Sequence, residues 1–322
     1  MRRVAYVTLS MSLTLMLVGN PVHADEGGVS FWAPGQFGSF VAVPEAPGLS
    51  MPLVYIHTSA DASASKSFIR GGLLTAGLET TGNLLFLFPT YTFKEPLLGG
   101  RAAFGLGWAA GNTQTTGTVT LTGPLGNTVT ARRTDTVAGG SDLYGLGTLK
   151  WNNGNNNCLT YTMFGAPVGA YQLGRLANIG INHWSADAGG GYTYLNANSR
   201  REFSVLGGLT YNFENPATNY KNGIDGHLDW TASQFLNEQI HVGLAGYLFY
   251  QFTGDSGAGA KLGDSISRVA SIGPQIGYFF PVARGKGYVN LKGFWEFGAK
   301  NRAEGWNLWL SLSVPLSMGT NN

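Results

Sequence analysis

Hydrophobic and polar residues alternate one by one near the C-terminal end of the chain. If residues 288–297 are extended, one face carries Val289, Leu291, Gly293, Trp295 and Phe297, and the other carries Asn290, Lys292, Phe294 and Glu296. The run from Trp306 to Leu316 repeats the pattern. About ten alternating residues followed by a turn are typical of a transmembrane β-barrel, although the strands of a secreted β-sandwich also alternate.

The same unit recurs along the chain and predicts about twelve strands. They span 51–60, 83–93, 101–110, 141–151, 158–168, 183–195, 201–213, 225–235, 240–252, 268–280, 286–297 and 305–316. Connections of about 7 to 30 residues alternate with connections of about 4 to 7 residues, as the loops and turns of outer-membrane barrels do. A sandwich has no reason to alternate its connections in this way. An even number of strands places both termini at the rim with the short turns.

Aromatic residues lie near both ends of the predicted strands, as in two membrane-interface girdles. The aromatic residues assigned to the girdles are Tyr91, Phe93, Trp108, Trp151, Tyr192, Tyr194, Phe213, Phe235, Tyr250, Phe252, Phe279, Phe280, Trp295 and Phe297. The long connection at Gly111–Gly140 is rich in threonine and glycine, and a hairpin above the membrane is one interpretation of it.

The N-terminus resembles a secretory signal peptide covering residues 1–24. Arg2 and Arg3 precede an apolar run, and Val22-His23-Ala24 offers a cleavage site. Charged residues make up only 12% of the chain, whereas soluble domains carry about a quarter. The net charge of +2 shows no basic cluster, so nucleic acid is not an expected partner.

Residues 25–50 form a separate segment, rich in glycine, proline and aromatic residues, ahead of a barrel domain at 51–322. Proline and glycine punctuate it too densely for regular structure, yet its aromatic rings favour burial. A plug that enters the barrel lumen is one interpretation, and a tail outside the barrel is the other.

The run from Gly27 to Ser39, which includes Trp32-Ala33-Pro34-Gly35-Gln36-Phe37-Gly38, resembles the start of the phenol meta-pathway degradation family of outer-membrane proteins. It is also distantly similar to the long-chain fatty-acid transporter family, whose N-terminal segment plugs the lumen. The resemblance implies passive uptake of small hydrophobic or aromatic molecules, with Phe31, Trp32, Pro34 and Phe37 in the plug. The C-terminus departs from many such barrels, because it does not end in an aromatic residue.

Candidate chemistry is sparse. His57 and Ser59 share one strand face, which an outer-membrane lipid hydrolase would need together with an orienting group. The scattered histidines and the single Cys158 do not predict a metal site or a disulfide, and no cofactor is expected.

The residues assigned to the barrel interior by alternation are the remaining site candidates: Lys150, Asn212, Glu214, His227, Asp229, Asn290, Lys292 and Glu296. They either pair across the lumen and close it or line a substrate path.

The sequence therefore predicts an all-β, transmembrane antiparallel barrel of about twelve strands, with an N-terminal plug-like segment, in the outer membrane. Its expected partners are outer-membrane lipid, lipopolysaccharide and a small hydrophobic or aromatic substrate. A structural or adhesive barrel with a closed lumen, or an outer-membrane lipid hydrolase, are the alternatives.

Overall fold

The computed structural model describes residues 30–70, 73–122, 128–261, 266–283 and 285–317. The predicted signal peptide and the first residues of the N-terminal motif lie outside these ranges. The strands are β1 (Gly48–Arg70), β2 (Leu73–Leu87), β3 (Thr90–Thr92), β4 (Arg101–Thr122), β5 (Thr128–Gly140), β6 (Leu143–Asn153), β7 (Asn156–Ala166), β8 (Ser185–Asn196), β9 (Arg201–Asn212), β10 (Asp225–Phe235), β11 (Ile240–Gln251), β12 (Arg268–Val282), β13 (Gly285–Lys300) and β14 (Glu304–Pro315).

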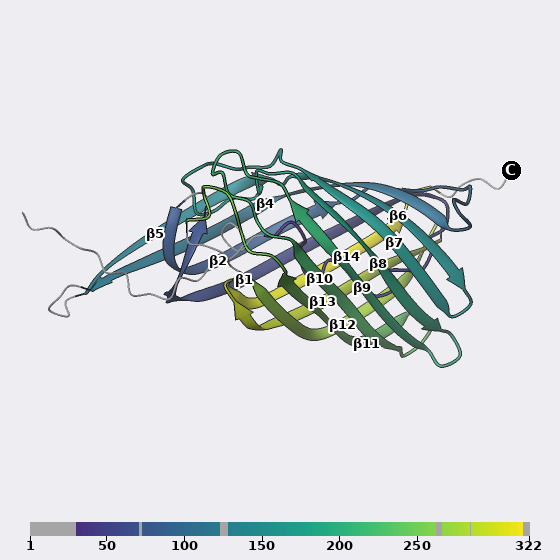
Figure 1. Ribbon diagram of the computed structural model, residues 1–322. Helices are drawn as coiled ribbons and strands as arrows, with labels where there is room; N and C mark the ends of the chain where they lie inside the picture. Colours follow the sequence, from purple (N-terminus) through teal and green to yellow (C-terminus); the bar gives the residue numbers. More distant parts are fainter. Residues whose placement is uncertain (1–29, 71–72, 123–127, 262–265, 284, 318–322) are drawn as a thin grey trace, which may run out of the picture.

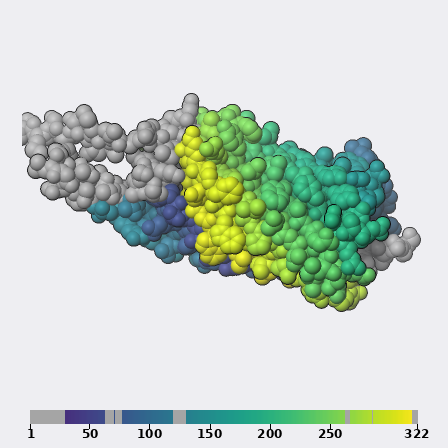
Figure 2. Space-filling model, turned by 90° about the horizontal axis from the view of Figure 1, so that it is seen from below, coloured from purple at the N-terminus to yellow at the C-terminus, as the bar shows by residue number. Residues whose placement is uncertain are grey.

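All neighbouring strands pair antiparallel, and the first strand closes the sheet on the last. The closing register runs from Ser50 opposite Pro315 to Asp61 opposite Glu304. In Figure 1 the tilted strands wrap around a long axis, and β1 lies beside β14. Figure 2 shows the same closure on the surface, where the yellow C-terminal strand meets the purple N-terminal one. Closure pairs both sides of each described strand in the barrel wall, so that part of the sheet has no edge with unpaired backbone groups.

Two of the fourteen described strands, β3 and β5, are not additional strands of the barrel wall. β3 pairs with β1 and β4, the neighbours of β2, so it continues β2 after the break at Pro89. β5 pairs with the outer half of β4 and forms a hairpin with it. The wall therefore has twelve strands, as predicted.

The hairpin confirms the interpretation of residues 111–140, but the predicted connection lengths were wrong there. Residues 61–70, 73–82, 111–122 and 128–140 continue the strands outward instead of forming loops. They are rich in Ser, Thr, Gly and Ala, and hydrophobic alternation is confined to short stretches such as 118–122. Ladder hydrogen bonds, which any residue except proline can make, hold them.

Side chains alternate between an exposed outer surface and a buried interior. In β7, Leu159, Tyr161 and Met163 are buried, whereas Thr160, Thr162 and Phe164 are exposed. β13 confirms the alternation predicted from sequence, with Asn290 and Lys292 inside and Leu291 and Trp295 outside. The outer surface is apolar, as the hydrocarbon core of a membrane requires. Among the described residues, no helix is long and apolar enough to cross a membrane.

The longer loops at the outer rim are tied to one another. Asn182 in the β7–β8 loop donates to Asn215 in the β9–β10 loop over 2.7 Å. Lys221 of the β9–β10 loop pairs through its backbone with Ser256 of the β11–β12 loop. Short turns occupy the other rim, where β14 ends (Figure 1).

An arginine at Leu291, on the outward face near the middle of β13, tests which surface meets lipid. We expect it to lower the free energy of unfolding in liposomes by about 2–4 kcal/mol, because the charge enters the centre of the bilayer. Phe297→Arg on the same face, near the outer end of the strand, should cost about 0–1 kcal/mol. Urea titration, with folded protein quantified by its heat-sensitive gel mobility, compares the two. Equal costs would contradict the assigned depth.

Candidate functional site

The segment Ser30–Gly48 follows the inner face of the barrel without regular structure. Pro34, Pro44 and Pro47 lack the N–H that a helix or a sheet ladder needs. Gly35 adopts φ +89°, and a Cβ atom there would lie 3.0 Å from the rings of both Phe294 and Tyr247. Many peptide groups of the segment therefore form their hydrogen bonds with side chains of the barrel wall.

Asp229 on β10 and Lys292 on β13 supply the central pair of contacts. Asp229 accepts hydrogen bonds from the backbone N–H groups of Gly35 (2.9 Å) and Phe37 (3.2 Å). Lys292 donates from Nζ to the carbonyls of the same two residues, over 2.6 and 3.0 Å. One carboxylate and one ammonium thus satisfy both donors and both acceptors of this turn. Both side chains are fully buried, so these charge-assisted bonds are strong.

A second group of wall side chains binds the next turn of the segment. Glu202 on β9 accepts from the backbone N–H of Phe40 (3.2 Å) and from the hydroxyl of Ser39 (3.1 Å). Gln275 on β12 donates to Ser39 over 3.0 Å. Asn290 bonds to Gln275 (3.4 Å) and to the carbonyl of Ile276 (3.2 Å), so it supports this group from the neighbouring strand.

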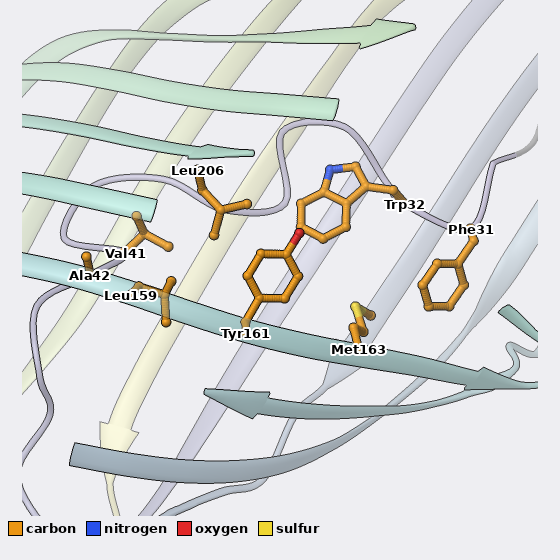
Figure 3. Close-up of a cluster of buried hydrophobic side chains, with 8 residues drawn as sticks. All are labelled: Phe31, Trp32, Val41, Ala42, Leu159, Tyr161, Met163 and Leu206. Carbon is orange, nitrogen blue, oxygen red and sulfur yellow. The ribbon is translucent and has the colours of Figure 1, made fainter. Parts of the chain in front are cut away.

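Trp32 anchors the start of the segment in a buried aromatic cluster. Its indole stacks on His227 with 3.5 Å between ring centroids and lies beside Tyr161. Figure 3 shows the rings of Trp32 and Tyr161 with Phe31, Leu159 and Met163 near them. His227 in turn lies 3.0 Å from the carboxylate of Asp187, which accepts a 2.7 Å bond from Tyr161.

Two glycines of the wall make room for this cluster. A Cβ at Gly165 would come within 2.4 Å of the Phe31 ring, and one at Gly208 within 2.1 Å of the Tyr161 hydroxyl. Part of the high glycine content therefore serves the packing of the lumen.

Phe40 sits in an aromatic collar nearer the short-turn rim. Phe235, His241, Phe279 and Tyr288 surround it, with ring centroids 5.3–5.9 Å away. The prediction that Phe235 and Phe279 belong to a lipid-facing girdle was therefore wrong. Both lie on inward positions of their strands and pack on Phe40 rather than on headgroups. Trp108, Phe252 and Trp295 are exposed on the outer surface, as predicted.

The other predicted interior residues have separate partners. Lys150 pairs with Glu45 of the segment over 2.5 Å, and Asn212 donates to Asp225 over 2.8 Å near the outer rim. Glu296 accepts from the Tyr247 hydroxyl (2.7 Å) and from the Gly305 N–H (2.9 Å). Glu214 does not belong to this set, because it lies beyond the end of β9 and is exposed.

The predicted plug residues all lie in the described part of the segment. Phe31 and Trp32 are buried, and Phe37 packs on Trp32 at 5.5 Å. Pro34, which lies between Trp32 and Phe37 in the sequence, is half-buried.

A cavity of about 530 Å³ separates the segment from the other half of the wall. Its body is apolar, lined by Val54 and Ile56 of β1, Phe86 of β2, Leu146 of β6 and Trp309 of β14, among others. It reaches the short-turn rim, where the exposed residues Leu49 and Lys286 line it. The segment thus binds one polar half of the barrel and faces an apolar space on its other side.

Several buried polar residues that hold the segment, or support the wall side chains packed on it, were missed as site candidates. Glu202, Gln275, Asp187 and Thr193 are buried inward positions of β8, β9 and β12, and Thr193 accepts the Ala42 N–H over 3.1 Å. Each is a polar residue on the inward face of a strand whose side chains alternate between the two faces. The alternation rule that selected Asp229 therefore selects them too. A polar residue facing inward is the available signal.

His57 and Ser59 lie on the outward face of β1, opposite the cavity-lining Val54 and Ile56. His57 Nδ1 is 2.8 Å from Asn83 Oδ1, and the ring packs on Trp306. Among the described residues, His57 bonds to Asn83 rather than to Ser59, so the link between nucleophile and base that a triad needs is not part of this geometry. In the described part of the chain, no group of three or more His, Cys, Asp or Glu side chains is placed to hold a metal ion.

Residues 58–312 match the model of the family described as "Putative MetA-pathway of phenol degradation". The chain belongs to this family. The match confirms the membership predicted from the N-terminal motif, although it begins after that motif. No curated protein matches the chain.

The structure resembles solved structures whose sequence identity to this chain is low. An outer membrane channel from Pseudomonas putida F1 is 13% identical, with a TM-score of 0.67 over 88% of this chain and 98% of that one. The transport unit of the autotransporter AIDA-I from Escherichia coli is 12% identical (TM-score 0.47; 87% and 92% covered). A Pseudomonas aeruginosa FadL homologue is 11% identical (TM-score 0.34; 92% and 98% covered). The first of these likenesses, with a TM-score above 0.5, supports the fold.

Asp229→Ala tests whether the central contacts hold the segment. It removes both acceptors for the Gly35 and Phe37 N–H groups, and each charge-assisted bond contributes about 1.5–3 kcal/mol. We expect chymotrypsin to cleave at Phe37 and Phe40 at least about tenfold faster, because release of the segment exposes them.

Glu296→Gln is the matched control, since Glu296 also faces the interior but bonds only to the wall. Cleavage products identified by mass spectrometry give the readout. Equal cleavage of Asp229→Ala and the wild type would mean that other contacts hold the segment.

Proposed function

We propose that this protein is an outer-membrane channel for passive uptake of small hydrophobic or aromatic compounds. Export follows from the predicted signal peptide at residues 1–24, and the apolar outer surface would contact membrane lipid and lipopolysaccharide. Passive transport needs a path, lining groups and a gate but no chemistry.

The observation that carries the proposal is the cavity inside the barrel. It has about 530 Å³ of space, within the range of pockets that hold small molecules. Its body is lined by aliphatic and aromatic side chains, which favour an apolar solute over an ion. A closed structural barrel would gain stability by filling this space, because unfilled apolar cavities are destabilising.

The segment Ser30–Gly48 is the proposed plug. The segment occupies the polar half of the lumen and forms hydrogen bonds with Asp229, Lys292 and Glu202. These charged groups are therefore not available to attract water and ions. The body of the path that remains is apolar. Family membership and the fold shared with an outer membrane channel support the same function.

Filling the cavity tests this function. Ala103 on β4 lines the cavity and is buried, whereas its neighbour Ala102 points to the other face. We expect Ala103→Trp to reduce protein-dependent uptake of radiolabelled naphthalene nearly to the level of cells without the protein, because the indole occupies the path.

Ala102→Trp adds the same volume outside the lumen and should keep wild-type uptake. Folded protein in each strain is matched by its heat-sensitive gel mobility. If the wild type takes up no more naphthalene than cells without it, the channel function fails. Equal uptake by the wild type and Ala103→Trp would show that the path lies elsewhere.

A further inference from the structure

The cavity is not apolar throughout. Its deeper part is lined by Val54, Ile56, Phe86 and Met163, but its end at the short-turn rim carries Lys150, near the end of β6. The Lys150 side chain is only 9% exposed. A long apolar space that ends at a buried cation matches an amphipathic molecule with one anionic end.

The carboxylate that neutralises Lys150 does not belong to the wall. Glu45, from the last part of the N-terminal segment, lies 2.5 Å from the ammonium, and its own side chain is 53% exposed. An ion pair with an exposed partner contributes little net stability. Glu45 therefore occupies the position of a ligand carboxylate and can be exchanged for one.

Besides Lys150, the cavity holds another hydrogen-bond donor, the side-chain amide of Gln36. The amide nitrogen of Gln36 is buried and has no hydrogen-bond partner among the described residues, and Gln36 lines the cavity. A buried donor without a partner is unfavourable. The cavity is thus better matched by a ligand that carries oxygen acceptors than by a plain hydrocarbon.

We propose that the cavity binds hydrophobic carboxylic acids, with the ring or alkyl part in the apolar body and the carboxylate on Lys150. The inference rests on the proposed channel function and names the substrate class that this path selects. Glu45 competes with the ligand for the same ammonium, so it also sets how readily the acid enters or leaves at this rim.

Equilibrium binding of two matched probes tests the proposal. 2-Naphthoate and 2-naphthamide have nearly the same shape, and only the first is an anion near neutral pH. Titration calorimetry on the detergent-purified full chain should show the acid binding at least about tenfold more tightly than the amide, as expected for one charge-assisted bond.

Three variants locate the effect. Lys150→Met should abolish the preference for the acid and leave the affinity for the amide unchanged. Glu45→Gln should strengthen binding of the acid alone, because it removes the competitor. Lys286→Met makes the same change of net charge at an exposed residue of the same rim and should keep the preference.

Equal affinities of the wild type for the two probes would overturn the proposal. So would a Lys150→Met variant that loses both probes equally, since the lysine would then only hold the segment. If the wild type binds neither probe, the apolar path itself is refuted and the inference falls with it. Heat-sensitive gel mobility verifies that every variant is folded.

Discussion

The peptide groups of an irregular segment inside a membrane-spanning barrel must all find partners. The hydrocarbon core of a membrane offers no hydrogen-bond partners. Non-helical backbone is therefore tolerated at that depth only where it is buried in protein or lines a water-filled cavity. Here Asp229 and Lys292 meet this requirement together, one taking the N–H groups of Gly35 and Phe37 and the other their carbonyls. The path of the segment through the lumen depends on this pair.

That constraint explains why the barrel interior has two different halves. Strands β8 to β13 carry the polar side chains that bind the segment, including Glu202, Asp229, Gln275 and Lys292. The strands around β1, β2 and β14 have no segment to bind, and they present Ile56, Phe86 and Trp309 to the cavity. Polar groups on the apolar side would lack partners, which is costly in a closed lumen.

The strands and their faces could be predicted from the sequence because alternation with a period of two is a local property. For residues 288–297, the faces predicted from the sequence are the faces that the structure has. The outward extensions of β1, β2 and β4 were missed, since they are rich in Ser, Thr, Gly and Ala and show little contrast between their two faces.

The site was predictable in part for the same reason. Alternation placed Asp229, Asn290 and Lys292 inside, but it did not say which would touch the segment. Phe235 and Phe279 were assigned to the wrong face because aromatic residues near strand ends look alike on both faces. Their inward position is explained by Phe40, on which both rings pack, and the position of Phe40 depends on the whole path of the segment. The cavity, formed by residues from eight strands and the segment, has no signal in any single stretch.

The measurement that tests this account most directly is a disulfide between the segment and the wall. The hydroxyl oxygens of Ser39 and Ser233 are 3.4 Å apart, so cysteines at both positions are close enough to bridge. In a background with Cys158→Ser, the refolded Ser39→Cys/Ser233→Cys protein should oxidise to a form without free thiols. Ser39→Cys/Gln234→Cys, whose second cysteine faces outward, should keep both thiols. Free thiols in both proteins would contradict a segment held against the polar wall of the lumen.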